Sequence, residues 1–234
     1  MIYYTNENQN DGLGSQLQKI LYTYLFCFFN DLPFVMNPIK KLEHNYNSNS
    51  DFENEINDFL NIKDYFPSRN VNENDSIHTL KFNEITHFIE HPPNMVKILN
   101  SKVMKYIRDC YWKNKTPKIK NYKTICIHIR RSNPHDTRVY GTETPTDFYF
   151  DKLDFLIFKE KLNKENIKVK IHTQSPLDFF NDSLNIKVYN DVDLKKVFHD
   201  FVSCDFLITS PSSLSYIASF FRDNQKSIYY IPFE

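Results

Sequence analysis

The stretch that decides the fold is Thr124–Arg138, which reads TICIHIRRSNPHDTR. Its first half alternates isoleucine with other residues, and this period of two predicts a β-strand with one apolar face. His128 and Arg130 are two positions apart, so we expect their side chains to project from the same face at the strand's carboxyl end. Arg131 should point to the opposite face. An Asn-Pro turn signal at 133–134 predicts that a loop follows.

This strand end is a candidate binding site because ligands of open α/β sheets bind just beyond the carboxyl ends of the strands. A pair of arginines there suits an anion, since each guanidinium group can contact two phosphate oxygens at once. The alternative interpretation is a solvated strand end with surface arginines, and the rest of the chain has to decide between the two.

Composition narrows the class of protein. The chain has 234 residues, enough for one large or two small domains, and 41% of them are hydrophobic. Lysine plus arginine and aspartate plus glutamate both total 29, so the net charge is zero and a basic nucleic-acid-binding surface is not expected. No apolar run is long enough to span a membrane, and the first residues lack the features of a signal peptide. The four scattered cysteines form no CxxC pair, which predicts a reduced, cytoplasmic protein without a zinc cage.

Glycine is scarce in this chain. It occurs only 3 times, whereas roughly 7% of residues is usual, so each glycine should have a backbone reason. Gly12 and Gly14 lie in one loop between an expected strand and an expected helix, an arrangement that presents backbone N–H groups to an anion. The loop is not a Walker motif, because no Gly-Lys-Ser/Thr follows it.

The order of elements predicts two α/β domains. In the first half we expect strands at 1–5 and 32–36, helices at 15–30, 52–60 and 94–112, and strand within 77–90. In the second half we expect strands at 124–130, 168–173, 186–189, 206–209 and 227–231, and helices at 147–164, 177–183, 194–203 and 212–221. Strands alternating with helices predict a parallel, doubly wound sheet. The basic, proline-containing segment between them places the domain boundary at 117/118.

A third informative stretch is Phe206–Phe220, FLITSPSSLSYIASF. A buried strand should end at Ser210, and Ser212 is placed to cap the next helix. Hydroxyl groups and free N–H groups at a helix start can hold a phosphate, although an ordinary N-cap serine gives the same pattern.

Together the three stretches resemble the superfamily of α-1,2-, α-1,6- and protein O-fucosyltransferases. The Gly-x-Gly-x-Gln loop of that superfamily is matched by Gly12, Gly14 and Gln16. Its His-x-Arg-Arg-x-Asp motif is matched at 128–132, with Asn133 where the superfamily usually has aspartate. Its Ser-Ser strand-to-helix turn followed by alanine is matched by the residues Ser212, Ser213 and Ala218.

The resemblance implies a GT-B fold, with two Rossmann-like domains, parallel doubly wound sheets and a donor site in the cleft. Residues 1–117 would form the acceptor-side domain and 118–234 the domain that binds the nucleotide sugar. It further implies an inverting, metal-independent glycosyltransferase that needs no cofactor. Such an enzyme moves a sugar, with fucose as first choice, from a GDP-sugar to a glycan or other hydroxyl acceptor.

The resemblance also assigns roles to residues. Arg130 would contact the diphosphate and His128 the nucleoside, with Arg131 beside them. The donor-binding set is completed by Gly12, Gly14, Gln16, Ser212, Ser213 and an acidic residue, either Asp193 or Asp200, that reads guanine in some members of the superfamily.

The chemistry requires a charge-stabilising group and a base. Displacing GDP from a sugar builds negative charge on the leaving diphosphate, which arginines and a helix N-terminus can stabilise in place of a metal. Arg130 is the candidate for this role. The acceptor hydroxyl needs a base, and Asp136 and Glu143 are the candidate carboxylates.

Two alternatives remain open. Asp191-Val192-Asp193 is a DxD sequence, the signature of metal-dependent glycosyltransferases that use UDP-sugars; it also precedes a helix, whose N-terminus favours acidic residues in any case. The chain could instead be a non-catalytic protein that binds a nucleotide sugar or glycan on the same fold.

Overall fold

The computed structural model describes residues 1–7, 10–43, 45, 49–66, 71–117, 120–131, 143–177, 184–223 and 228–229. The chain divides into two compact units, Met1–Thr116 and Pro117–Glu234. Both are α/β units with parallel strands, as the pattern of elements predicts.

The first unit is built on a long buried helix. Strands β1 (Ile2–Asn6) and β2 (Ser76–Leu80) form a two-stranded parallel sheet, and α1 (Leu13–Phe29) packs beside β1. Most of α1 is buried on all sides, as its apolar sequence predicts, although Phe28 is half exposed. The remaining helices are α2 (Phe52–Leu60), α3 (Ile62–Tyr65), α4 (Phe82–Glu90), α5 (Pro92–Leu99) and α6 (Lys102–Trp112).

Two expectations for this unit need correction. The strand expected at 32–36 is only a single parallel bridge between Phe34 and Tyr4, because Pro33 has no N–H to extend the ladder. The prediction of strand within 77–90 is confirmed: β2 ends at Leu80, and α4 begins at Phe82.

The helix expected at 94–112 is two helices. It breaks after Leu99 because the Ser101 hydroxyl caps a new helix, accepting the Met104 N–H at 3.2 Å.

The second unit is a five-stranded parallel sheet in the order β5-β4-β3-β6-β7. Its strands are β3 (Lys123–Ile129), β4 (Ile167–Thr173), β5 (Ile186–Asn190), β6 (Phe206–Ile208) and β7 (Ile228–Tyr229). Its helices are α7 (Thr146–Lys159), α8 (Leu194–Ser203) and α9 (Ser213–Phe220), with a short 3₁₀ turn, η1 (Lys164–Asn166), before β4. In chain order this is the third-second-first-fourth-fifth arrangement of a doubly wound sheet.

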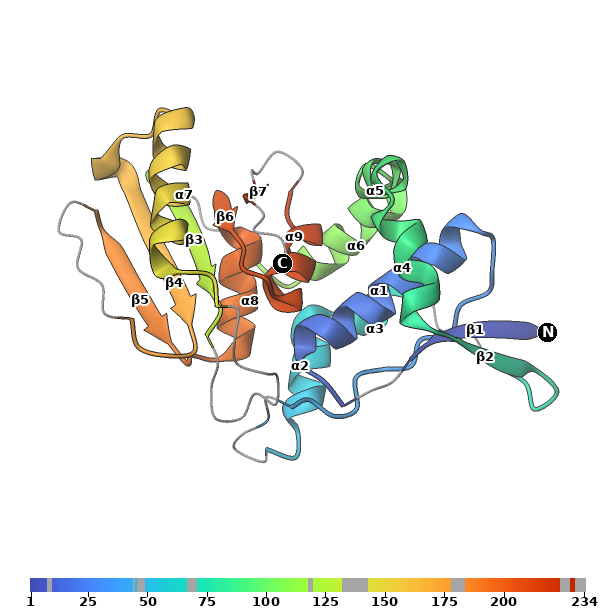
Figure 1. The fold of residues 1–234 in the computed structure, drawn as a ribbon. Helices are drawn as coiled ribbons and strands as arrows, with labels where there is room; N and C mark the ends of the chain where they lie inside the picture. The colour runs from blue at the N-terminus through green and yellow to red at the C-terminus, as the bar shows by residue number, and fades with distance from the viewer. Residues whose placement is uncertain are drawn as a thin grey trace. The chain divides into compact units, whose positions relative to one another are not determined.

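The two faces of this sheet differ as the alternation in β3 predicts. Helices α7 and α8 lie on opposite faces (Figure 1). On the α7 face, the isoleucines of β3 pack with buried residues of the helix such as Tyr149 and Leu153. On the α8 face, the Cys126 thiol donates to the Asp200 carbonyl at 3.3 Å, and the His128 ring lies 5.1 Å from the Phe201 ring. One face is therefore an apolar core, and the other carries polar groups.

Two expected elements differ in extent or lie outside the description. Helix α7 ends at Lys159 instead of 164, because Glu160 and Lys161 turn the chain and Lys161 adopts a positive φ of 50°. The helix expected at 177–183 falls on residues that, apart from Leu177, lie outside the described ranges.

Candidate functional site

The strand order reverses between β3 and β6, and this reversal marks the candidate site. The chain moves outward from β3 to β4 and β5, then returns to the other side of β3 as β6. In doubly wound sheets, the crevice at the carboxyl ends of such a pair of strands is where ligands bind. His128 lies near the end of β3 and Arg130 directly follows this strand. Ser210 and Ser212 come shortly after β6.

His128 and Ser210 join the two strand ends directly. Ser210 Oγ lies 2.9 Å from His128 Nδ1, and both side chains are buried. Burial, helped by the nearby charge of Arg130, lowers the pKa of His128 to about 3. The imidazole is therefore neutral at neutral pH and offers one donor and one acceptor nitrogen.

The two arginines have different surroundings, as their positions on a strand predict. Arg131 donates from Nη1 to the Thr144 carbonyl at 3.0 Å and from Nη2 to Thr146 Oγ1 at 2.6 Å. Its Nε lies 3.5 Å from Glu143 Oε2. Arg131 thus holds the segment that enters α7, and its contact with a donor stays a prediction. Arg130 is partly buried directly after β3, and its charge acts on the His128 ring.

The start of α9 has the predicted capping serine. Ser212 Oγ accepts the Leu214 N–H at 3.3 Å, and the backbone of Ser212 is extended. No acidic residue occupies the first turn, where Ser213 lies, so the positive end of the helix dipole is not neutralised there. This geometry is compatible with a bound phosphate, and it is also what any serine-capped helix shows.

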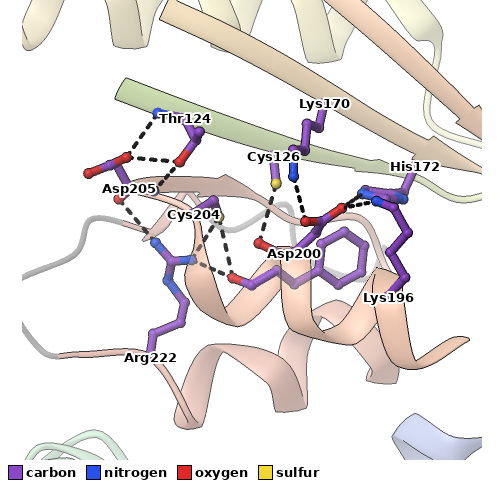
Figure 2. A network of polar contacts seen from close by, with 10 residues as sticks. Thr124, Cys126, Lys170, His172, Lys196, Asp200, Cys204, Asp205 and Arg222 are labelled. Atoms are coloured by element: carbon purple, nitrogen blue, oxygen red, sulfur yellow. Dashed lines mark hydrogen bonds and ion pairs between the residues drawn. The ribbon is translucent and has the colours of Figure 1, made fainter. Parts of the chain in front are cut away.

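Asp200, one of the two candidate guanine readers, is the centre of a charge cluster (Figure 2). Its carboxylate contacts Lys170 Nζ at 2.5 Å, Lys196 Nζ at 2.6 Å and His172 Nε2 at 3.1 Å. Burial alone would raise the pKa of Asp200, but the hydrogen bonds from His172, Lys170 and Lys196 outweigh burial and hold the pKa well below its usual range. Both carboxylate oxygens are engaged within the protein.

Asp193, the other candidate, caps helix α8. Its Oδ1 accepts the Lys195 N–H at 2.8 Å, and the residue is exposed. Asp191 turns the chain with a positive φ of 46°, and its N–H donates to the Thr173 carbonyl at 3.1 Å. The capping interpretation of the DxD sequence therefore accounts for Asp193. Across the described ranges, no three His, Cys, Asp or Glu side chains come together as a metal-binding group.

The Gly12–Gly14 loop belongs to the first unit. Gly12 is the N-cap of α1 and Gly14 lies buried in its first turn; neither has a positive φ. Gln16 donates from Nε2 to the carbonyls of Asp11 at 2.7 Å and Lys41 at 2.6 Å, so its amide N–H groups hold the loop. Contact of Gly12, Gly14 and Gln16 with a donor sugar nucleotide stays a prediction.

Of the two candidate bases, Glu143 and Asp136, only Glu143 lies among the described residues. Glu143 is half exposed and pairs with Arg131. Asp136 lies outside the described residues, as do Ser132 and Asn133 of the central motif. No described contact therefore bears on Asp136.

A second network, also drawn in Figure 2, ties the amino ends of the neighbouring strands together. The Asp205 carboxylate accepts the Thr124 N–H at 2.9 Å and the Thr124 hydroxyl at 2.8 Å. Arg222 is fully buried and donates to the Phe201 and Asp205 carbonyls and to Cys204 Sγ. These contacts lie at the opposite ends of the strands from His128, and they anchor the sheet on which the site is built.

Comparison with known proteins finds similarity only among solved structures. No family model and no curated protein sequence matches the chain. NodZ α-1,6-fucosyltransferase co-crystallised with GDP is 11% identical, with 99% of this chain and 94% of that chain covered and a TM-score of 0.42. The fucosyltransferase NodZ from Bradyrhizobium gives the same identity and coverage at a TM-score of 0.43. POFUT1 in complex with GDP is 12% identical, with 98% and 72% covered and a TM-score of 0.40. Every one of these TM-scores is below 0.5, so the similarity alone assigns neither fold nor function.

The structure adds residues that the sequence did not single out. Ser210 was expected only as a strand end, and Lys170 and His172 were given no site role. A signal was present, because Lys170 and His172 alternate with Val169 and Ile171 in the same way that Cys126 and His128 alternate with isoleucines. Their contact with Asp200 depends on the packing of α8 over β4, which alternation does not reveal.

Within the described part of the chain, no helix combines the length and apolar character needed to cross a membrane.

Proposed function

We propose that this protein is a glycosyltransferase that takes its sugar from a GDP-sugar, with fucose as first choice, and transfers it to a glycan or other hydroxyl acceptor. The observation that carries the proposal is the pairing of His128 with Ser210 across the β3–β6 reversal, with Arg130 next to them. A motif that resembles the fucosyltransferase signature thus coincides with the position where doubly wound sheets bind nucleotides.

The proposed reaction is an inverting, metal-independent displacement at the sugar carbon. The acceptor oxygen forms the new bond, the bond to the diphosphate oxygen breaks, and GDP leaves with the electron pair. Arg130 and the first turn of α9, with Ser212 and Ser213, would stabilise the charge on the diphosphate. A carboxylate takes the proton of the acceptor hydroxyl; Asp136 and Glu143 remain the candidates, and Glu143 would act beside the cation of Arg131.

A nucleotide screen tests the donor. Thermal unfolding would be followed with GDP, UDP plus manganese, CMP, dTDP and ADP. We expect GDP to stabilise the protein by roughly 2.7 kcal/mol at a hundredfold excess over Kd. Stabilisation by UDP with manganese and not by GDP would favour the metal-dependent alternative. GDP binding without turnover of any GDP-sugar would favour a binding protein.

The two arginines provide a matched pair of variants. Arg130→Lys keeps the charge and loses the planar fork, so we expect turnover to fall by about 10² to 10³. Arg131→Lys loses the bonds to Thr144 and Thr146, so we expect a lower melting temperature with turnover largely retained. Near-full activity of Arg130→Lys combined with an inactive, folded Arg131→Lys would refute the assignment of roles.

A further inference from the structure

Two buried acceptor atoms at the carboxyl end of β4 have no hydrogen-bond partner among the described residues. They are His172 Nδ1 and Gln174 Oε1. Buried polar atoms in native proteins are almost always hydrogen-bonded. Unmatched acceptors beside the candidate site are therefore groups that a bound ligand could supply with partners.

Strand register places both residues beside the candidate site. His172 pairs with His128 across the β3–β4 ladder, and Thr173 pairs with Ile129. Gln174 directly follows β4, as Arg130 directly follows β3. His172 lies on the same face as His128, since both rings contact Phe201, and Gln174 comes two positions later in the chain.

The chemistry of each atom follows from its neighbours. Burial lowers the pKa of His172 in spite of Asp200, so the ring is neutral at neutral pH. Its Nε2 lies 3.1 Å from the ionised Asp200 carboxylate and therefore carries the proton, which leaves Nδ1 as an acceptor. Gln174 has a carboxamide, which presents one acceptor and one donor side by side.

The acidic residues near α8 are less suited to read a base. Asp200 is buried, and both of its oxygens are held by Lys170, His172 and Lys196. Asp193 is exposed and caps the helix. The carboxyl end of β4 is thus better placed than α8 to supply acceptors to a nucleoside whose diphosphate lies at the β3–β6 reversal.

We propose that Gln174 and His172 read the base of the bound nucleotide and select guanine. The proposal rests on the function proposed above. The Watson–Crick edge of guanine carries an acceptor, O6, next to two donors, N1–H and the N2 amine. Gln174 accepts from N1–H and donates to O6, and His172 Nδ1 accepts from the N2 amine. Uracil has a single ring N–H donor on this edge and leaves one acceptor unmatched, which a site built for polar groups penalises.

Calorimetric titration with GDP, IDP and UDP tests this assignment. IDP keeps N1–H and O6 but lacks the N2 amine. We expect the wild-type protein to bind IDP about tenfold more weakly than GDP, and UDP more weakly still. Nitrogen-15 NMR should show the Nδ1 signal of His172 shifting with GDP and not with IDP.

Substitution of Gln174 tests its contribution to nucleotide binding separately from that of His172. Gln174→Leu should weaken GDP and IDP binding equally, by about tenfold, and reduce the preference for GDP over UDP. The matched control is Asn190→Leu, which removes an exposed carboxamide at the end of the neighbouring strand and should leave all three affinities unchanged.

The outcomes separate the two proposals. Tight GDP binding with equal affinities for GDP and IDP in the wild type overturns the role of His172 and leaves the proposed function standing. If folded Gln174→Leu binds GDP, IDP and UDP with wild-type affinities, the role of Gln174 is overturned and the proposed function still stands. Absence of GDP binding to the wild-type protein removes both the proposed function and this inference. The comparison of GDP with IDP needs no substitution, so it remains decisive if Gln174→Leu does not fold.

Discussion

The buried, neutral state of His128 predicts a pH dependence of stability that can be assigned to one residue. Burial lowers its folded-state pKa to about 3, whereas its ordinary value is 6.5. Between these two values the unfolded chain binds a proton that the folded protein does not, so the free energy of unfolding must decrease as pH falls. At pH 5 the pH lies 1.5 units below 6.5, and at about 1.36 kcal/mol per unit His128 should lower the stability by about 2 kcal/mol relative to pH 7.5.

Urea unfolding of the wild type and of His128→Asn at pH 7.5 and 5.0 measures this contribution. Asparagine keeps an acceptor that the Ser210 hydroxyl can contact but does not titrate. His172 and Cys204 also have shifted pKa values, but both residues are present in each protein and cancel in the difference. The wild type should lose about 2 kcal/mol more than the variant on going to pH 5.0. Equal losses would mean that His128 takes up a proton as readily when folded as when unfolded, and would refute its burial at the strand end.

Two further predictions concern other charged and backbone features. Asp200→Asn should lower the free energy of unfolding at pH 7 by about 3 kcal/mol, because it leaves Lys170 and Lys196 without their carboxylate. Because the pKa of Asp200 is lowered in the folded protein, the carboxylate contributes its full stability at pH values above its ordinary pKa of 3.8. This contribution is lost as pH falls through the folded-state pKa. If the wild type and the variant unfolded in acid at the same midpoint, the ion cluster would be contradicted. Gly14→Ala should not destabilise helix α1 through its backbone, since Gly14 has no positive φ and alanine gains up to about 1 kcal/mol in a helix. Weaker GDP binding by a fully folded Gly14→Ala protein would show close approach of that backbone to the ligand, and unchanged affinity would reduce the loop to a plain helix start.

Local elements were predictable where one physical signal dominated. Helices α2 and α8 begin and end at the predicted residues because their apolar positions recur at helical spacing. The 94–112 helix was predicted as one because its apolar residues continue across residues 100 and 101; the break depends on a single capping bond from Ser101, which outweighs that continuity. The strand within 77–90 was predicted without bounds because a short apolar run does not distinguish strand from helix.

The sequence by itself determined the face on which each side chain of β3 lies, because the alternation of a strand is a local property of the backbone. It therefore predicted that His128 and Arg130 would share a face and that Arg131 would make separate contacts. Only the tertiary structure decided that Ser210, 82 positions along the chain, would contact His128, and that Asp200 would be enclosed by Lys170, His172 and Lys196. Those contacts depend on strand order and on how α8 packs over the sheet. Strand order depends on which segments, far apart in the sequence, bury their apolar surfaces against one another. No periodic pattern in the sequence around either residue reveals it.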